Sequence, residues 1–448
     1  MLPALFLIAT PAQISLPSAL DLALRNDPRV KLAQDDLRRA IAARQEVRDA
    51  YLPAANANGG AGYTYGITLT VPTIFTLDAQ SLIYSPSQRH YTSASRWELQ
   101  AAQLGVTNAR EQVEEDLALT YMSLANAQET AEALLSAYQH ATALSDIVQQ
   151  RLDAGIENQL EWKQARRTAA QIRLQVLQQQ DEQENLRARL AQMTALPAAG
   201  LRVVRSSITA VPSAIDSTSV PFRSETLDQA RAKLQAQGRR ERALADARDP
   251  WKPVITFNAQ YARVSPINNV TDYYNLQGRY NIFSFGAAVR FPFLDAAARA
   301  RKRVALADAA HATDEFASAQ FRSEDDLRGL RHSIAELAAR SDLAELEAGI
   351  AADQLTITRK LSRDGGNGYA IANPKDVERA AIQERQRYIA LLDTTLQLQR
   401  VQLSYLRQTG NLERWVQSTH DTSAPASVSG APAHLPGPSP LTTAPRRR

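Results

Sequence analysis

The side chains of this sequence that could do chemistry are mostly carboxylates and guanidinium groups. The chain has no cysteine, six histidines and three methionines. Without cysteine it has no thiolate nucleophile, thiolate metal ligand or disulfide, and so few soft ligands argue against copper or silver handling. The sequence also lacks a Gly-rich phosphate loop, a His-Glu-x-x-His pair and a Gly-x-Ser-x-Gly motif. We therefore predict that the protein is not an enzyme and carries no cofactor or metal.

The remaining charges are balanced along the chain. The formal net charge is +4 over 448 residues, and part of it lies in the terminal run 446–448. This is too weak a basic field to indicate a nucleic-acid partner. The acidic pairs Glu114-Glu115 and Asp325-Asp326 lie within long helical patterns, and we expect them to be solvated faces.

Charged residues also gather at two glycine-containing breaks between helical patterns. The first break covers 153–158 and is followed by Glu161. The second covers 363–369 and is followed by Asp376 and Arg379. Gly155 and Gly365 permit the positive φ of a tight turn, while Gly366 and Gly368 make the second turn longer and looser. The charges are either functional or ordinary solvated helix-end charges.

Long helical patterns position these breaks. From about Glu98 to Ala154, and from about Asp295 to Arg363, apolar residues recur three or four apart without proline. About 57 to 69 helical residues make a rod of roughly 85 to 100 Å, and heptad-like spacing over that length predicts helix packed on helix. Shorter helices are expected over about 18–50 and 158–195. A plain coiled coil would explain the helices equally well.

Alternating segments precede both long helices. Apolar or small residues alternate with polar ones over about 55–71, 255–261 and 283–293, and aromatic residues cluster near the strand ends. Such strands, with one apolar and one small polar face, match a transmembrane β-barrel. A soluble sheet covered by helices is the alternative, but the strands come as isolated pairs. The second strand of the first pair is weak and is expected near 89–98.

The chain repeats its own organisation with an offset of about two hundred residues. The predicted helix-to-strand junction Arg48-Asp49-Ala50-Tyr51-Leu52-Pro53 recurs as Arg248-Asp249-Pro250-Trp251-Lys252-Pro253. We predict a signal peptide over 1–15, repeat 1 over 16–196 with a strand pair in 54–98, and a linker or equatorial region over 197–223. Repeat 2 then covers 224–416 with a strand pair in 254–293, and a disordered tail covers 417–448.

These segments resemble the TolC-like outer-membrane efflux protein family. The opening Leu16 to Pro28 is similar to the family's "AL..AL..NP" start, and Arg48 to Pro53 resembles its helix-to-strand junction. Arg151-Leu152-Asp153-Ala154-Gly155 resembles its "R...G" turn, followed by Leu160-Glu161 where the family has a polar or acidic position. The resemblance covers nearly everything from Leu16 to about Val416 and depends on the order, spacing and duplication of these motifs.

The resemblance implies a mainly α fold with a transmembrane β-barrel portion. In a homotrimer, four strands from each chain would form a twelve-stranded barrel, continued by a long α-helical barrel in the periplasm. It also implies a passive outer-membrane channel of a tripartite efflux or type I secretion system. The implied partners are a periplasmic adaptor (membrane fusion) protein, an inner-membrane pump and outer-membrane lipid. The alternative is a periplasmic or cytoplasmic coiled-coil scaffold.

The resemblance also assigns expected roles to the residues at the two breaks. Members of the family close the periplasmic end with carboxylates and inter-helix polar links. The aperture candidates here are Glu161, Asp364, Asp376 and Arg379. Asp376, in Lys375-Asp376-Val377, best matches the family's acidic selectivity position, and Arg379 departs from a second acid one turn on. The candidates for adaptor docking are Asp153, Gly155, Ile156, Gly365, Gly366 and Gly368.

Overall fold

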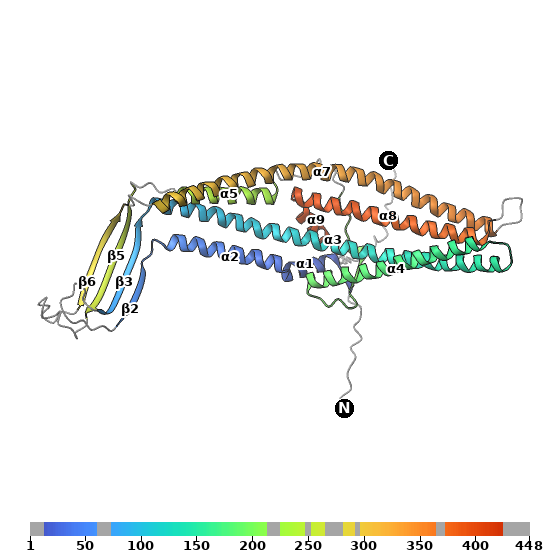
Figure 1. Ribbon diagram of the computed structural model, residues 1–448, viewed down its shortest axis with the longest axis horizontal. Helices are drawn as coiled ribbons and strands as arrows, with labels where there is room; N and C mark the ends of the chain where they lie inside the picture. Colours follow the sequence, from blue (N-terminus) through green and yellow to red (C-terminus); the bar gives the residue numbers. More distant parts are fainter. Residues whose placement is uncertain are drawn as a thin grey trace, which may run out of the picture.

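The computed structural model describes residues 13–60, 73–212, 225–246, 252–264, 281–291, 296–363 and 372–423. Within them the molecule is an elongated bundle of helices with a β-sheet at one end (Figure 1). The helices are α1 (Leu16–Asn26), α2 (Pro28–Asp49), α3 (Pro86–Asp153), α4 (Gln159–Thr194), α5 (Leu227–Asp246), α7 (Ala296–Arg363), α8 (Pro374–Thr409) and α9 (Leu412–Ser423). The strands are β1 (Gln13–Ile14), β2 (Ala54–Gly59), β3 (Thr73–Tyr84), β4 (Arg202–Val203), β5 (Val254–Val264) and β6 (Asn281–Arg290), and a 3₁₀ turn, η1 (Arg205–Ser207), follows β4.

A capping residue and a proline separate the first two helices. The Oδ1 atom of Asp27 accepts the backbone N–H of Arg29 at 2.8 Å, and Pro28 occupies the first turn of α2. Since the residue before a proline avoids the helical region, Asp27 is extended, with φ −61° and ψ 128°. The single helix expected over about 18–50 is therefore two helices, α1 and α2.

Two helices of equal length run along most of the molecule. α3 and α7 each contain 68 residues, and α4 and α8 each contain 36. At 1.5 Å per residue the long helices measure about 100 Å. α3 packs mainly against α2, α4, α5 and α8, whereas α7 packs mainly against α5 and α8. α3 is therefore the central helix, and α7 lies at one side of the bundle (Figure 1).

The first strand pair ends earlier than the sequence predicts. β3 covers Thr73–Tyr84 and α3 begins at Pro86, so the strand expected near 89–98 is wrong. Proline sets a helical φ in the first turn, which explains the early start of α3. Tyr91, part of the loose alternation there, lies on α3 and donates its hydroxyl to Asp246 of α5 at 2.5 Å.

The strands at the end of the bundle form one antiparallel sheet in the order β2-β3-β5-β6. β3 pairs with β5, so the two strand pairs are joined and not isolated as expected. On one face Asp78 lies opposite Gln260. On the other face Leu77 lies opposite Tyr261, which lies opposite Phe283. The predicted alternation of polar and apolar residues is therefore kept across the sheet.

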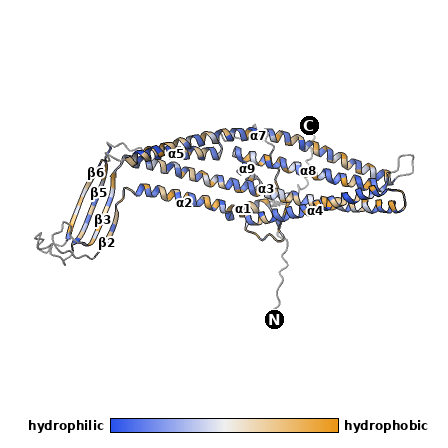
Figure 2. Ribbon diagram, in the orientation of Figure 1, coloured by the Kyte–Doolittle hydropathy of each residue, from blue (hydrophilic) through white to orange (hydrophobic). Residues whose placement is uncertain are grey.

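In the described part of the chain the apolar face of the sheet has no cover. Phe283 and Phe285 on β6 are 75% and 83% exposed. Figure 2 shows apolar residues along β3, β5 and β6, while apolar and polar residues are mixed along the helices. None of the helices in the described part of the chain is long and apolar enough to span a lipid bilayer.

The largest buried cluster surrounds the middle of α3. There α1, α9, β1, β4 and the ends of α4 and α8 pack together, and we call this part the equatorial region. Tyr121 is fully buried; its hydroxyl donates to the carbonyl of Ile14 at 2.8 Å and accepts the N–H of Val204 at 2.9 Å. Leu117 and Leu124, about one turn away on each side, are also fully buried. The main hydrophobic core is therefore equatorial.

The structure bears on three predicted ranges. Ile14 of β1, within the range predicted as a signal peptide, is buried and pairs with β4, and residues 1–12 lie outside the described part. In the predicted linker 197–223, β4 and η1 belong to the equatorial region, and 213–223 are not described. α9 continues to Ser423, anchored by the buried Trp415, so the tail predicted over 417–448 is wrong for 417–423.

Candidate functional site

The end of the bundle opposite the sheet holds the turn between α3 and α4. Gly155 has φ 72°, the left-handed region that favours glycine. The N–H groups of Ile156 and Glu157 both donate to the carbonyl of Arg151, at 2.8 and 3.2 Å. Asn158 then caps α4 by accepting the N–H of Glu161 at 2.9 Å. The first break is therefore a tight turn, as predicted, and we call this end of the molecule the tip.

Two ion pairs join the start of α4 to the start of α8 at the tip. Lys375 Nζ lies 2.5 Å from Glu157 Oε1, and Arg379 lies 2.8 Å from Glu161. Glu157 lies in the turn just before the cap of α4 and Glu161 in the first turn of α4, whereas Lys375 and Arg379 lie four residues apart on α8, on successive turns. They connect the α3–α4 hairpin to the α7–α8 hairpin.

The inner of these pairs is largely buried. Glu157 and Lys375 have side chains 11% and 17% exposed, and Arg151 also donates to Glu157 at 3.2 Å. The hydrogen bond from Lys375, followed by that from Arg151, lowers the pKa of Glu157. The carboxylate is therefore charged at neutral pH, and the link weakens only as the pH falls through the lowered pKa.

The structure brings together part of the predicted aperture set. Glu161 and Arg379 form an ion pair, which the sequence analysis did not anticipate. Asp376 instead faces the end of its own helix, where Asn373 donates its N–H to Asp376 Oδ2 at 3.2 Å in a capping box. Asp364, Gly365, Gly366 and Gly368 lie outside the described residues.

Exposed apolar side chains accompany the charges at the tip. Ile156 is 64% exposed and Leu160 is 62% exposed. Asp153, on the same turn, accepts a hydrogen bond from Gln149 at 2.9 Å. Behind them Leu144 and other residues of α3, α4 and α8 form a second hydrophobic cluster. The tip therefore presents an apolar turn on a packed support.

Both predicted helix-to-strand prolines lie at the expected position. Pro53 directly precedes β2 and Pro253 directly precedes β5, where a missing N–H removes no ladder hydrogen bond. At the first junction the carbonyls of Arg48 and Asp49 accept the N–H groups of Tyr51 and Leu52, the latter at 2.8 Å. Arg248 and Asp249 lie outside the described residues.

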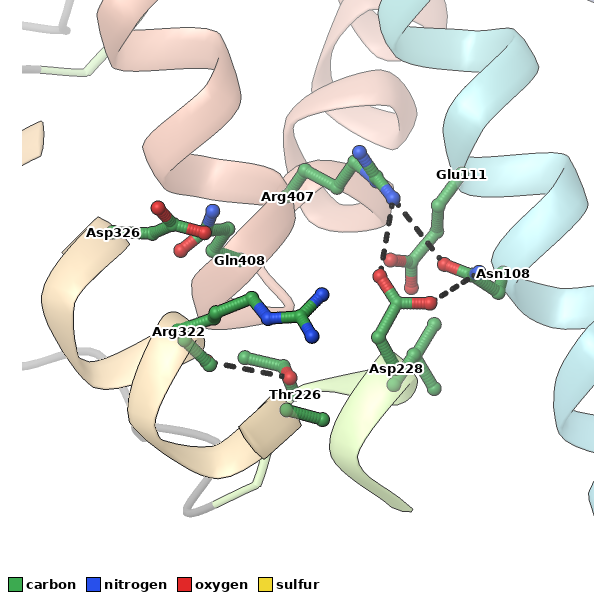
Figure 3. Close-up of a pocket in the computed structure, with 11 residues that line it drawn as sticks. Asn108, Glu111, Thr226, Asp228, Arg322, Asp326, Arg407 and Gln408 are labelled. Atoms are coloured by element: carbon green, nitrogen blue, oxygen red, sulfur yellow. Dashed lines mark hydrogen bonds and ion pairs between the residues drawn. The ribbon is translucent and has the colours of Figure 1, made fainter. Parts of the chain in front are cut away.

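A polar pocket of about 290 Å³ lies where α5 begins and α8 ends, between α3 and α7 (Figure 3). Arg407 of α8 lies 3.0 Å from Glu115 of α3 and 3.7 Å from Asp228 of α5. Asn108 of α3 donates to Asp228 at 2.8 Å. In Figure 3, Arg322 of α7 extends toward these groups from the opposite wall. The pocket contains charges of both signs, and the contacts of Arg407 and Asp228 link α3, α5 and α8.

The acidic pair at 114–115 is not a solvated face. Glu115 pairs with Arg407, and Glu114 is 7% exposed with Oε2 buried and without a hydrogen bond. Burial, followed by the nearby carboxylates of Glu111 and of Glu413 on α9, raises the pKa of Glu114 to about 7, against the partial effect of Arg110. The prediction holds for Asp325-Asp326, both of which are exposed.

The sequence carried a signal for the missed tip residues. Glu157, within the first break, and Glu161 are separated by the same four-residue interval as Lys375 and Arg379 after the second break, with opposite charge. Only this interval is a signal in the sequence, because alignment of the caps Asn158 and Asn373 matches Glu161 with Asp376 and not with Arg379. Within the described residues no group of three or more His, Cys, Asp or Glu side chains could hold a metal ion.

No known family's sequence profile matches this chain, and no curated protein is significantly similar to it in sequence. Solved structures are similar. The outer membrane protein VceC of Vibrio cholerae has a TM-score of 0.69 at 18% identity, over 88% of this chain and 96% of its own. The Campylobacter jejuni CmeC outer membrane channel has a TM-score of 0.71 at 17% identity, over 90% and 89%. The Neisseria gonorrhoeae MtrE outer membrane channel has a TM-score of 0.65 at 14% identity, over 89% of this chain and 89% of its own.

The chain therefore has the fold of outer-membrane channel proteins. The expected resemblance to the TolC-like family is confirmed at the level of the fold and extends over almost the whole length of these relatives.

The buried carboxyl of Glu114 predicts a pH dependence of stability. Its pKa is about 7 in the folded chain against 4.5 for a free side chain, so the folded state binds the proton more tightly. Stability therefore falls as the pH rises from about 4.5 to 7 and stays lower above. Glu114→Gln, which cannot ionise, should raise the free energy of unfolding at pH 8 by up to about 3 kcal/mol and change it little at pH 5.

Thermal unfolding of the two proteins at pH 5 and pH 8, followed by circular dichroism, measures this effect. The control is Asp325→Asn on the exposed face of α7, which should leave stability unchanged at both pH values. Equal pH dependence in the wild type and Glu114→Gln would show that Glu114 is not the titrating group.

Proposed function

We propose that three copies of this chain form a tube that exports substrates through the outer membrane of a Gram-negative bacterium. The sheets would join into one twelve-stranded barrel in the membrane, and the helices would continue it as a tunnel in the periplasm. The observation that carries this proposal is a four-stranded sheet at the end of a helical bundle, apolar on one face and with two unpaired edges.

The faces of the sheet support a membrane location. A barrel strand in an outer membrane turns apolar residues to lipid and polar residues to the lumen. Phe283, Phe285 and Tyr261 lie on one face, and the rings of Tyr261 and Phe283 are 4.7 Å apart. Asp78 and Gln260 lie on the other. Exposure of large aromatic rings is favourable if lipid surrounds them.

The edges of the sheet support a ring of copies. β2 and β6 each have one neighbouring strand among the described residues, and a long apolar edge strand is a template for pairing with another chain. β2 and β6 run in opposite directions, because three antiparallel pairings separate them. β6 of one copy can therefore pair antiparallel with β2 of the next, a head-to-tail contact that closes into a ring.

The outer helices support the same arrangement. Leu343, Leu346, Ile350 and Ile357 of α7 are all more than half exposed and follow heptad-like spacing. On the opposite side of the chain, α2 and α4 expose further apolar residues: Leu32, Ile41, Leu174 and Leu177. A neighbouring copy would cover both stripes, which together form a larger apolar surface than single chains normally expose.

In this tube the chain is a passive conduit and not an enzyme. Energy would come from an inner-membrane pump, linked by a periplasmic adaptor protein to the tip, in a tripartite efflux or type I secretion system. The exposed Ile156 and Leu160 at the tip support adaptor docking. The halves 16–196 and 224–416 would be structural repeats, supported by the equal lengths of α3 and α7 and of α4 and α8.

The ion pairs at the tip would restrain the periplasmic opening. Glu157–Lys375 and Glu161–Arg379 hold the two hairpins of one chain together, and opening requires hairpins to separate. Carboxylates of Glu161 and Asp376 facing the lumen of a trimer would occur in threes and attract cations.

Assembly can be tested by cross-linking, because the chain has no cysteine of its own. Ala55→Cys on β2 is combined in turn with Phe285→Cys, Ala287→Cys and Val289→Cys on β6. At least one pair should give a covalent species of three chains on oxidation of outer membranes, since opposed side chains on one face lie about 5 Å apart.

The matched control pairs Ala55→Cys with Ser284→Cys, on the opposite face of β6, which should not cross-link. Covalent species that stop at two chains, or a complete lack of intermolecular cross-links in membrane-inserted protein, would contradict the proposed ring.

Conductance in planar lipid bilayers tests the restraint at the tip. Lys375→Gln combined with Arg379→Gln removes both ion pairs that join the hairpins at the tip, so single-channel conductance should rise severalfold. The control, Arg387→Gln, breaks the pair with Glu347 that joins α8 to α7 within one hairpin and should leave conductance near the wild-type value. Equal conductance of the wild type, the double variant and the control would show that the tip ion pairs do not restrain the opening.

Adaptor docking at the tip is tested at Gly155. Gly155→Leu places a side chain at a positive φ, which costs about 1 kcal/mol and distorts the turn. Pull-down with a periplasmic adaptor protein from the same organism should weaken, while the yield of trimers stays unchanged. Wild-type adaptor binding by the variant would place docking elsewhere.

A further inference from the structure

The first turns of α7 carry an unusual concentration of positive charge. Arg299, Arg301, Lys302 and Arg303 are all exposed, and the first turn of this helix contains no acid. A helix N-terminus already carries a partial positive charge, so cations there are unfavourable without an anion nearby. Arg299, Lys302 and Arg303 have no hydrogen bond or ion pair with another described residue.

Two of these cations point away from the body of the chain. Ala309 and Ala312 are buried and mark the side of α7 that packs inward. At about 100° per residue, Arg303 lies about 150° and Arg299 about 110° around the helix from the mean direction of these two alanines, and the two cations are one turn apart. A single negatively charged group can therefore contact both guanidinium groups.

The position of the cations matches the headgroups of a bilayer. β6 ends at Arg290 and α7 begins at Ala296. Residues 299–303 lie about 5 to 10 Å along the helix axis from its start. The headgroup layer of one leaflet is about 5 to 8 Å thick, so these side chains reach it if the apolar face of the sheet lies in lipid.

Aromatic residues place the membrane boundary at the same level independently. Tyr51 follows α2, Tyr84 ends β3 and Phe291 follows β6, and all three are exposed. Each lies at a junction between the sheet and the helical bundle. Exposed aromatic rings at this position are typical of the interfacial girdle of outer-membrane proteins.

The opposite edge of the chain has a groove with matching chemistry. Ile41, Arg44, Arg48 and Leu52 line a groove of about 660 Å³ at the end of α2, together with Gln45, Asp49 and Tyr51. Its lining has two arginines against one carboxylate, that of Asp49, so it can accept a phosphate, and its apolar residues suit an acyl chain. In the proposed ring this edge adjoins α7 of the next copy.

A neighbouring copy does not supply the missing negative charge. Near the end of α2 the acids Glu46 and Asp49 are balanced by Arg44 and Arg48. In the proposed ring Arg299, Lys302 and Arg303 would therefore meet a surface without net charge, which leaves them available to an anion from outside the protein.

We propose that the start of α7, with the groove at the end of α2, binds the phosphate headgroup of an anionic phospholipid in the periplasmic leaflet of the outer membrane. This inference rests on the proposed function, because it needs the sheet in a bilayer. Guanidinium groups bind phosphate oxygens in a bidentate way. Each cation near an anionic surface strengthens binding about fivefold.

Native mass spectrometry of the detergent-extracted protein, with phosphatidylglycerol or phosphatidylcholine added, tests the proposal. The wild-type protein should retain phosphatidylglycerol in preference to phosphatidylcholine and melt at a higher temperature with it. Arg299→Gln/Lys302→Gln/Arg303→Gln should bind phosphatidylglycerol at least about tenfold more weakly. Arg303→Gln alone should lower the affinity for phosphatidylglycerol about fivefold. This single variant provides the test if the triple variant fails to fold.

The matched control is Arg359→Gln/Lys360→Gln/Arg363→Gln, which removes the same charge from the far end of the same helix. It should keep wild-type lipid binding. Equal loss in the control would indicate a general charge effect and overturn the proposal, as would unchanged binding by Arg303→Gln and the triple variant. Stabilisation by glycerophosphate alone would assign the site to free phosphate and not to lipid.

Two further results separate this proposal from the others. If the triple variant is monomeric without added lipid while the wild type is trimeric, the cations pair with the neighbouring copy and the lipid assignment is wrong. If the wild type conducts in bilayers of pure phosphatidylcholine but shows no preference for phosphatidylglycerol, the channel function stands and only the lipid site fails.

Discussion

The buried hydroxyl of Tyr121 holds the middle of the molecule together. Helices of about 100 Å have few neighbours per residue, so they need at least one place where several elements meet. At Tyr121 the hydroxyl bonds the carbonyl of Ile14 and the N–H of Val204, elements that lie far from α3 in sequence. Loss of these bonds would leave buried backbone groups unpaired. The equatorial region therefore sets where α1, α4, α8 and α9 lie against α3.

From this region the molecule extends in two directions with different physical requirements. Toward the tip, α3, α4 and α8 share a small apolar cluster, and ion pairs hold the hairpins to one another. Ion pairs between helix starts can separate without exposing much apolar surface, so they suit a part that opens. Toward the sheet, backbone hydrogen bonds dominate, and these must all be satisfied inside a lipid bilayer. The two ends therefore suit an opening and a fixed membrane anchor, respectively.

Exposed apolar residues and strand edges with only one neighbouring strand are concentrated on the two sides of the chain. The exposed leucines and isoleucines of α7, the apolar stripe of α2 and α4, and the edges β2 and β6 all lack partners among the described residues of one chain. The proposed head-to-tail ring would cover all three surfaces at once. The ring would not neutralise the cations at the start of α7, because the adjoining end of α2 has no net charge. For this reason the lipid headgroup, and not a further protein contact, is the partner that their chemistry fits.

The sequence by itself determined the elements whose signal is periodic and local. The long helices, the second strand pair and the turn at Gly155 follow from spacing and backbone preference, which neighbours in the chain decide. Predicted boundaries were wrong where the local pattern was weak. Residues 89–98 alternate only loosely and belong to the helix that begins at Pro86. Only the tertiary structure decided which charges meet. Glu114 and Glu115 share a helical pattern with the exposed Asp325-Asp326, yet α8 and α9 pack over the first pair and leave the second in water, since burial depends on elements hundreds of residues away.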